Sequence, residues 1–449
     1  MTKNLTVGSP ALLIVSFTIP LLIGNLFQQF YNMADTFIVG RTIGVSALAA
    51  VGCTGSLMFL ILGFVMGFSS GTSIITAQRF GASDNAGVRR SFAVSIVLNA
   101  LMALVLMAIS VPSTRFLLSL IRTPAEIIDG AYDYIIVIFW GIPAVVLFNL
   151  LSNVMRAVGD SRTPLVFLVI ACVINIILDY VLILVFHMGT AGAAYATVIA
   201  QLVSALLCVL YIVKKLPLLT IKKEDWRFEK GELWVHLKVA FPMGFQLSII
   251  AIGVVIIQFA LNGLGTTAVA AFTAAQKIDM VATLPMSSFG VTMTTYTAQN
   301  YGARKYGRIK SGCLQCSLIS GAFSIFMGLL FVFTGRSFAA LFIGADTAAV
   351  DLAQVYLVIN GSCYVILAVL FIFRQTLQGL GDSVVPTVAG IMELVMRSFA
   401  ALFLSAPFGF AGICFASPLA WLGSCVPLVI AFGFTIRKLT RKSLAERRA

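Results

Sequence analysis

The sequence is poor in charged residues. Only 10% of its 449 residues are Asp, Glu, Lys or Arg, whereas 60% are hydrophobic. Ordinary globular domains carry about 25% charged residues, so a soluble protein of this length could not cover its surface with so little charge. The scarcity of charge therefore excludes an ordinary soluble protein and indicates a polytopic membrane protein.

The sequence also lacks the residue clusters of metal and redox chemistry. Its two histidines, His187 and His236, lie far apart, and nearly all of its eight cysteines lie in or beside apolar runs. Free cysteine in such a setting behaves as a small hydrophobe. Cys313 and Cys316 have CxxC spacing, but no histidine is near them. We find no nucleophile–base constellation in the apolar runs, so we expect no enzyme, no cofactor and no metal centre.

The hydrophobic residues are gathered into runs that are long enough to cross a bilayer, for which a helix needs about 20 residues. Twelve such runs predict an all-α polytopic membrane protein with twelve transmembrane helices. They lie near 11–34, 46–70, 91–111, 131–155, 164–186, 190–213, 239–261, 267–296, 312–334, 350–373, 386–406 and 410–436. No small-residue cleavage site follows the first run, so we expect it to be retained as the first span.

Basic residues are distributed unequally between the loops. If the N-terminus is cytoplasmic, 24 of the 30 Lys and Arg residues fall in cytoplasmic segments and four in outer loops. This asymmetry follows the positive-inside rule, and it predicts a plasma-membrane protein with both termini in the cytoplasm. The net charge of +13 is therefore expected to face lipid rather than nucleic acid.

Three loop motifs recur at a spacing of about 221 residues. The stretch AQRFGA at 77–82 returns as AQNYGA at 298–303, GDSRTP at 159–164 as GDSVVP at 381–386, and GTAGAAYA at 189–196 as GFAGICFA at 409–416. Such a repeat predicts two six-helix bundles related by a pseudo-two-fold axis along the membrane normal, which is typical of transporters. We expect an N-lobe over 1–213, a basic cytoplasmic linker over 214–238, a C-lobe over 239–436 and a basic cytoplasmic tail over 437–449.

Six ionisable residues are candidates for charges at membrane depth, where each costs about 2.5–3.5 kcal/mol on insertion scales and marks function by default. They are Asp35, Asp179, Lys277, Asp279, Glu393 and Arg397. Glu393 and Arg397 are four residues apart with the acid first, which favours an intrahelical ion pair. Lys277 and Asp279 point about 200° apart on a helix, so each needs another partner; they remain secondary candidates for either a structural or a functional role.

Asp35 and Asp179 are the strongest candidates for a functional site. Neither has a basic residue within one helical turn. Their sequence neighbours are neutral polar side chains instead: Gln28, Tyr31 and Asn32 share a helical face with Asp35, and Asn175 precedes Asp179 by one turn. Burial without a cation disfavours the charged form of a carboxyl group. We therefore expect these two groups to take up and release a proton.

At these residues the sequence resembles the MATE (multidrug and toxin extrusion) family, nearest its prokaryotic DinF-like branch. The resemblance covers essentially the whole chain and includes YNMADTFIVG at 31–40, NIILD at 175–179 and RAVGD at 156–160. It implies export of organic, cationic drugs or metabolites by alternating access, driven by inward H⁺ or Na⁺. It also implies a cation site at Asp35 and Asp179, completed by polar side chains at Gln28, Tyr31, Asn153, Asn175 and Thr197, with Asn149 as an alternative to Asn153.

Several alternatives remain open from the sequence. A flippase for a lipid-linked precursor would favour a basic cavity, whereas the six candidate charges at membrane depth are four acids and two bases. The coupling ion is either H⁺, which we favour, or Na⁺ bound at Asp35 and Asp179. Another branch of the family carries acids in helices 7 and 10 for sodium, and helix 7 here has none, which disfavours that second site. The expected partners are the lipid bilayer and small organic substrates, with the protein acting as a monomer.

Overall fold

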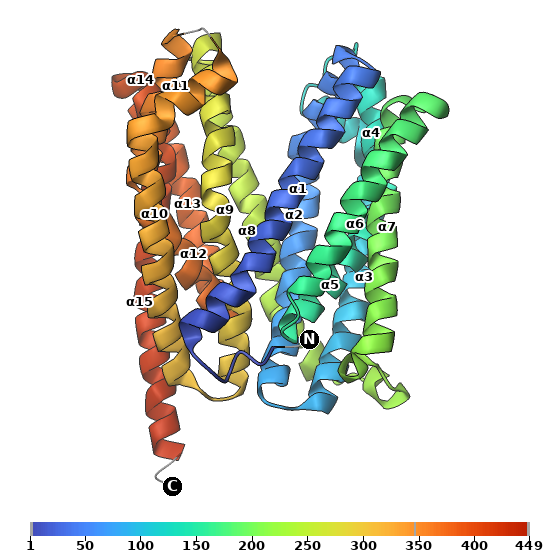
Figure 1. Ribbon diagram of the computed structural model, residues 1–449, viewed down its shortest axis with the longest axis vertical. Coiled ribbons are helices and arrows are strands. Elements are labelled where there is room, and N and C mark those ends of the chain that lie inside the picture. Colours follow the sequence, from blue (N-terminus) through green and yellow to red (C-terminus); the bar gives the residue numbers. More distant parts are fainter. Residues whose placement is uncertain (1–2, 345–346, 447–449) are drawn as a thin grey trace. The chain divides into compact units, whose positions relative to one another are not determined.

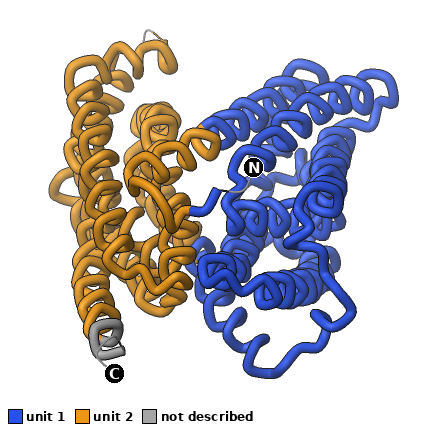
Figure 2. Tube along the Cα trace, turned by 60° about the horizontal axis from the view of Figure 1, so that its bottom comes forward, with its two compact units in different colours: residues 1–4, 23–248 blue, residues 5–22, 249–449 orange. Residues whose placement is uncertain are grey.

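The computed structural model describes residues 3–344 and 347–446, with side chains to residue 441, and every regular element in these residues is helical (Figure 1). The all-α prediction is confirmed. Arg447 and Arg448, which we assigned to the basic tail, lie outside the described residues. The chain divides into two compact units (Figure 2). Unit 1 comprises residues 1–4 and 23–248, and unit 2 comprises residues 5–22 and 249–449.

The first half of the chain contains seven α-helices and three short helical segments. The α-helices are α1 (Pro10–Thr42), α2 (Val45–Gly81), α3 (Asn85–Leu120), α4 (Ile128–Trp140), α5 (Ile142–Ala157), α6 (Arg162–Tyr180) and α7 (Gly189–Lys215). The short segments are the π-helix η1 (Val181–Val185) and the 3₁₀-helices η2 (Pro217–Leu219) and η3 (Lys223–Trp226).

The second half contains eight α-helices and one π-helix. They are α8 (Lys230–Asn262), α9 (Thr266–Gly302), α10 (Tyr306–Ile343), α11 (Thr347–Ser362), α12 (Tyr364–Gly379), α13 (Val384–Phe399), the π-helix η4 (Ala400–Leu404), α14 (Ser405–Cys414) and α15 (Ala416–Glu446).

Eleven of the twelve expected spans coincide with helical segments that are long and apolar enough to cross a membrane, and the twelfth lies in a helix that does not meet this criterion. Within the described residues, nine helical segments are long and apolar enough to cross a membrane by length and composition, and two bent pairs pass the same test together. The remaining expected span, 267–296, lies in α9, a helix of 37 residues. Two expected spans are not single straight helices: α4 and α5 meet at 49°, and α11 and α12 meet at 51°. Pro143 lies in the first turn of α5, where proline starts a helix but cannot continue the preceding one.

The two halves also share unusual backbone conformations at matching positions of the sequence repeat. Gly159 and Gly381, which open the repeated GDS turns, have φ angles of 89° and 86°. Ser83 and Arg304, which follow the repeated AQ motifs, have φ angles of 59° and 55°, although non-glycine residues seldom adopt positive φ. The π-helices η1 and η4 also occupy corresponding places in the two halves. The two halves therefore share irregular geometry as well as sequence.

The linker between the halves is packed against unit 1. Asp225 in η3 accepts a hydrogen bond at 3.0 Å from Nε of Arg89 in α3, and its carboxylate also accepts from the backbone N–H of Lys222 at 2.8 Å. Leu219 in η2 is buried in an apolar cluster formed by α3, α5 and α7. The basic stretch is thus anchored at both of its 3₁₀-helices rather than free along its length.

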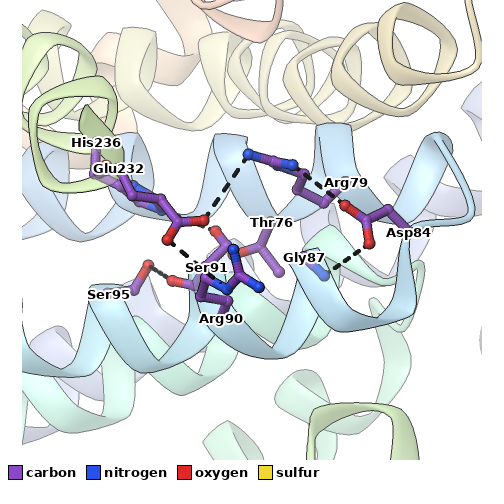
Figure 3. A network of polar contacts seen from close by, with 9 residues as sticks. All are labelled: Thr76, Arg79, Asp84, Gly87, Arg90, Ser91, Ser95, Glu232 and His236. Atoms are coloured by element: carbon purple, nitrogen blue, oxygen red, sulfur yellow. Dashed lines mark hydrogen bonds and ion pairs between the residues drawn. The ribbon is translucent and has the colours of Figure 1, made fainter. Parts of the chain in front are cut away.

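A polar network fixes the beginning of α8 to α2 and α3 (Figure 3). Glu232 lies between Arg79 and Arg90, with a charged-atom separation of 3.9 Å to each. His236 is fully buried and contacts the Ser91 hydroxyl at 2.8 Å through Nε2. Further along, α2 and α8 approach so closely that a Cβ on Gly67 would lie 2.3 Å from the carbonyl oxygen of Met243, so only glycine fits there.

The first helix of each half contributes to both units. In α1, residues up to Leu22 belong to unit 2 and residues from Ile23 to unit 1, whereas α8 changes from unit 1 to unit 2 after Ser248. Each helix contains a proline shortly before this change, Pro20 in α1 and Pro242 in α8. Proline removes one helix hydrogen bond, so each helix has a local weak point near its change of unit.

Candidate functional site

Unit 1 brings together polar side chains from α1, α6 and α7. The Tyr31 hydroxyl in α1 donates to Oγ1 of Thr197 in α7 at 3.1 Å. In the amide orientation that satisfies both its ends, Asn175 in α6 donates to a carboxylate oxygen of Asp179 at 3.2 Å and accepts from the Thr197 N–H at 3.2 Å. Thr197 therefore joins Tyr31 to Asn175, and Asn175 extends this network to Asp179.

Asp35 and Asp179 are buried carboxyl groups with little compensation. Asp35 is 8% exposed and Asp179 is 0% exposed. In the described part of the chain, neither has a Lys, Arg or His partner in an ion pair, and one carboxylate oxygen of each is buried without a hydrogen bond. The two groups are close enough to interact electrostatically. Burial of a carboxylate without a counter-charge is costly, so these two groups lack compensation for their negative charge.

The local backbone at Asp179 is irregular. Asp179 is the penultimate residue of α6, directly before the π-helix η1. Single-turn π-helices widen a helix and occur frequently at functional sites. The π-helix η1 begins two residues after Asp179, with no α-helical turn between them. A change in the hydrogen bonds of the Asp179 carboxyl group would therefore affect a segment that already departs from α-helical geometry.

Where the structure describes the chain, the other polar residues that we expected at this site do not join the hydrogen-bond network of Tyr31, Thr197, Asn175 and Asp179. Gln28 is half-buried and Asn32 is exposed, and neither side chain has a hydrogen bond among the described residues. Asn153 accepts a hydrogen bond from Nη1 of Arg156 at 3.2 Å, whereas Asn149 donates to the Val145 carbonyl oxygen. The structure therefore brings neither asparagine into hydrogen-bond contact with Asp35 or Asp179.

The sequence analysis missed Tyr134. This residue of α4 is 4% exposed, and it lies close enough to both Asp35 and Asp179 to interact with them electrostatically. It packs in an apolar cluster with Ile38, Val39 and Ile138. A buried tyrosine is a signal for a polar neighbour, but only the packing of α4 against α1 shows which neighbour it has.

The other intramembrane charges lie in unit 2. Nη2 of Arg397 donates to Oε1 of Glu393 at 2.8 Å, which confirms the predicted pair. Arg374, which we counted with the cytoplasmic loops, is instead 5% exposed in α12 and donates to Oε2 of Glu393 at 2.7 Å. Asp279 accepts a hydrogen bond from the Tyr364 hydroxyl, and Lys277 is exposed.

The donor set suits a proton or a hard cation. Within the described residues, no group of three or more His, Cys, Asp or Glu side chains is placed to hold a metal ion. The cluster offers carboxylate, amide and hydroxyl oxygens, which are ligands that hard cations prefer. The same carboxylates can also be protonated. These oxygens can therefore either accept a proton or coordinate a hard cation.

The family model MatE matches residues 20–181 and 242–401, which is most of the chain and falls once in each half. The chain belongs to the MatE family. It is therefore a membrane transporter and not an enzyme. The two matched segments follow the internal repeat, and each contains the helices that carry the buried charges of its own unit.

Curated relatives of this MatE chain include proteins from two bacterial genera. It is 29% identical over 404 residues to the probable multidrug resistance protein YpnP of Bacillus subtilis (strain 168), covering 89% of this chain and 90% of the relative. It is 23% identical over 396 residues to the multidrug export protein MepA of Staphylococcus saprophyticus, covering 88% and 87%. The matches extend through both halves of the chain.

Solved structures share the fold. A crystal structure of MATE in the bent conformation matches with a TM-score of 0.88 at 25% identity, covering 99% of this chain and 100% of the other. A MOP superfamily transporter from Pyrococcus furiosus, described as having a binding pocket of reverse polarity, matches with a TM-score of 0.86 at 25% identity, covering 98% of both chains. The expected fold class of two six-helix bundles is thereby confirmed.

Proposed function

We propose that this chain exports small organic compounds, cationic drugs or metabolites among them, in exchange for inward-moving H⁺ at the plasma membrane. The observation that carries the proposal is the pair of buried carboxyl groups, Asp35 and Asp179, which lie close enough to interact and have no basic partner among the described residues. The multidrug export functions named for YpnP and MepA support the substrate class. Both termini face the cytoplasm in this proposal, and the monomer is the working unit.

Protonation would change the hydrogen-bond chemistry of the cluster. An ionised carboxylate only accepts hydrogen bonds, whereas a protonated carboxyl group also donates one. Asp35 and Asp179 each have a buried oxygen without a partner, so a proton would allow a new bond within the cluster. The Asn175 amide, which donates to Asp179 and accepts from Thr197, would then rearrange together with its neighbours.

The change would be transmitted through α1. Asp35 lies in the part of α1 that belongs to unit 1, and Pro20 lies before the residue at which α1 changes unit. A rearrangement at Asp35 would bend the helix at the missing hydrogen bond of Pro20. This bend would close the substrate space of unit 1 and expel the substrate outward, and release of the proton to the cytoplasm would reset the helix.

The available driving force is adequate for export. A tenfold proton gradient supplies about 1.4 kcal/mol per proton, and a membrane potential of about 100 mV adds about 2.3 kcal/mol for each charge moved. When one uncharged substrate is exchanged for one proton, one net charge crosses, and the sum of the two supports a concentration ratio of about several hundredfold. When a monovalent cation is exchanged for one proton, no net charge crosses, and the pH gradient alone supports a ratio of about tenfold.

The test is transport of a fluorescent organic cation in inverted membrane vesicles under an imposed pH gradient or an imposed Na⁺ gradient. We expect pH-driven transport by the wild type and its loss in Asp35→Asn and Asp179→Asn. The matched control is Asp129→Asn in α4 of the same unit, because the side chain of Asp129 is 79% exposed and pairs only with the exposed Arg115. Full transport in both cluster variants would overturn the coupling role, and transport driven by Na⁺ alone would replace H⁺ as the ion.

A further inference from the structure

Unit 2 contains a cavity of about 200 Å³ that the carboxylate cluster of unit 1 does not include. Side chains from α8, α9, α11, α12, α13 and α15 line it. This volume equals that of about seven water molecules, so the cavity holds a compact organic molecule of amino-acid size. Its walls combine polar and aromatic side chains: Asp279, Arg397, Gln276, Phe272, Tyr356 and Trp421.

Two opposite charges line this cavity without pairing with each other. Asp279 comes from α9 and Arg397 from α13. Over residues 3–344 and 347–441, no ion pair joins them: Asp279 accepts from the Tyr364 hydroxyl, and Arg397 donates to Glu393. A cavity with separated charges of opposite sign is complementary to a ligand that carries the reverse charges, because each ligand charge then finds its own partner.

The side of the cavity formed by Arg397 has more positive than negative charge. Arg374 and Arg397 donate to the two oxygens of the same carboxylate, that of Glu393, at 2.7 and 2.8 Å. Two guanidinium groups and one carboxylate leave one positive charge without a counter-charge inside this cluster. Nε of Arg397 is also buried without a hydrogen bond in the described part of the chain, and the residue is only 8% exposed. A carboxylate or phosphate group on a ligand beside Arg397 would supply the missing counter-charge.

The position of Arg397 is supported by close helix packing. A Cβ on Gly253 of α8 would lie 3.2 Å from Cδ of Arg397, so the arginine stem lies directly on a helix surface that carries no side chain. The remaining walls are aromatic. The rings of Phe272 and Tyr356 meet edge to face with centroids 5.0 Å apart, and Trp421 completes this part of the lining. Aromatic walls with a few placed polar groups are typical of small-molecule sites.

We propose that the cavity of unit 2 binds a compact zwitterion, with an anionic group at Arg397, an ammonium group at Asp279 and an apolar, flat body against the aromatic side chains of the wall. This site is separate from the carboxylate cluster of unit 1, and the proposal does not depend on the coupling role of Asp35 and Asp179. It assigns a ligand function to the charges of α9 and α13, which the export scheme does not use.

The test compares three probes of one shape that differ only in charge. Phenylalanine is the zwitterion, 3-phenylpropionate carries only the anionic group, and 2-phenylethylamine carries only the cationic group. Binding of labelled phenylalanine to the purified full-length chain in lipid nanodiscs is measured by equilibrium dialysis, and the other two compounds compete. We expect saturable binding, with phenylalanine at least about tenfold tighter than either competitor, since each lost charge pair costs at least one such factor.

The variants remove one charge at a time and keep the neighbouring contacts. Arg397→Gln leaves Glu393 paired with Arg374, and Asp279→Asn keeps an oxygen that accepts from Tyr364. We expect Arg397→Gln to abolish the advantage of phenylalanine over 2-phenylethylamine. We expect Asp279→Asn to abolish its advantage over 3-phenylpropionate. These two complementary losses would distinguish direct contact with each ligand charge from a general loosening of unit 2.

Matched controls come from a surface pair in the same unit. Arg336 and Asp351 are 2.9 Å apart, and their side chains are 63% and 58% exposed. We expect Arg336→Gln and Asp351→Asn to bind phenylalanine like the wild type. Absence of saturable binding, equal affinity for all three probes, or the same change in the controls as in the cavity variants would overturn the proposal.

Discussion

Replacing Glu393 with glutamine would leave two buried guanidinium groups beside each other. The Glu393 side chain is 6% exposed, as is that of Arg374, and that of Arg397 is 10% exposed. Removing one partner of a buried ion pair costs about 3–5 kcal/mol, because the other charge stays buried without compensation. In Glu393→Gln both arginines lose their carboxylate, so we expect a destabilisation in or above this range.

The same cluster predicts a smaller loss of stability for the Arg397→Gln substitution. Arg397→Gln removes one charge-assisted hydrogen bond, worth about 1.5–3 kcal/mol, but it leaves a neutral pair between Arg374 and Glu393. It also removes the excess positive charge, which offsets part of the loss. We therefore expect Glu393→Gln to be more destabilising than Arg397→Gln by at least about 1 kcal/mol, in keeping with the larger charge that it leaves unpaired.

Thermal unfolding of the purified protein in detergent, followed by tryptophan fluorescence, measures this order. The expected order of apparent Tm is wild type, then Arg397→Gln, then Glu393→Gln. The control is Arg336→Gln, because its partner Asp351 is exposed and surface pairs contribute about 0–1 kcal/mol. If Arg397→Gln lowered the Tm as much as Glu393→Gln does, the account of a shared carboxylate with one excess positive charge would be refuted.

Two further predictions concern unit 1. Gly67→Ala places a Cβ against the backbone of Met243, where no flexible side chain can move aside. We expect the free energy of unfolding to fall by about 1–3 kcal/mol, seen as a lower apparent Tm. The control is Gly52→Ala, which has open space around it and should leave the Tm unchanged. Tyr31→Phe removes the hydroxyl that donates to Thr197; we expect reduced pH-driven dye transport at an unchanged Tm, and wild-type transport in this variant would exclude Tyr31 from the network.

Much of the fold could be predicted because its determinants are local or periodic. Long apolar runs define helices one by one, and the recurrence of AQ-x-[FY]-GA and GDS motifs shows that the second half copies the first. The pair of Glu393 and Arg397 could be predicted as well, because a spacing of four residues brings two side chains together on any helix. None of these conclusions requires knowledge of how one helix packs against another.

The candidate site could be predicted only in part. Burial and lack of a basic neighbour in sequence singled out Asp35 and Asp179, and the structure joins Asp179 to Asn175 and Thr197. The same reasoning did not find Tyr134, and the structure ties Asn153 to Arg156 instead. These differences arise because the rotation of each helix about its axis decides which of its polar side chains face one another, and the sequence of a single helix does not determine that rotation.

The sequence by itself determined that this chain is a membrane protein of two homologous helical halves, because hydropathy, charge asymmetry and repetition are properties of the chain alone. Only the tertiary structure decided that Arg374 is buried on Glu393 and that Asp279 and Arg397 line one cavity. Those contacts join helices that are far apart in the sequence. They depend on the packing of whole helices, which many residues determine together.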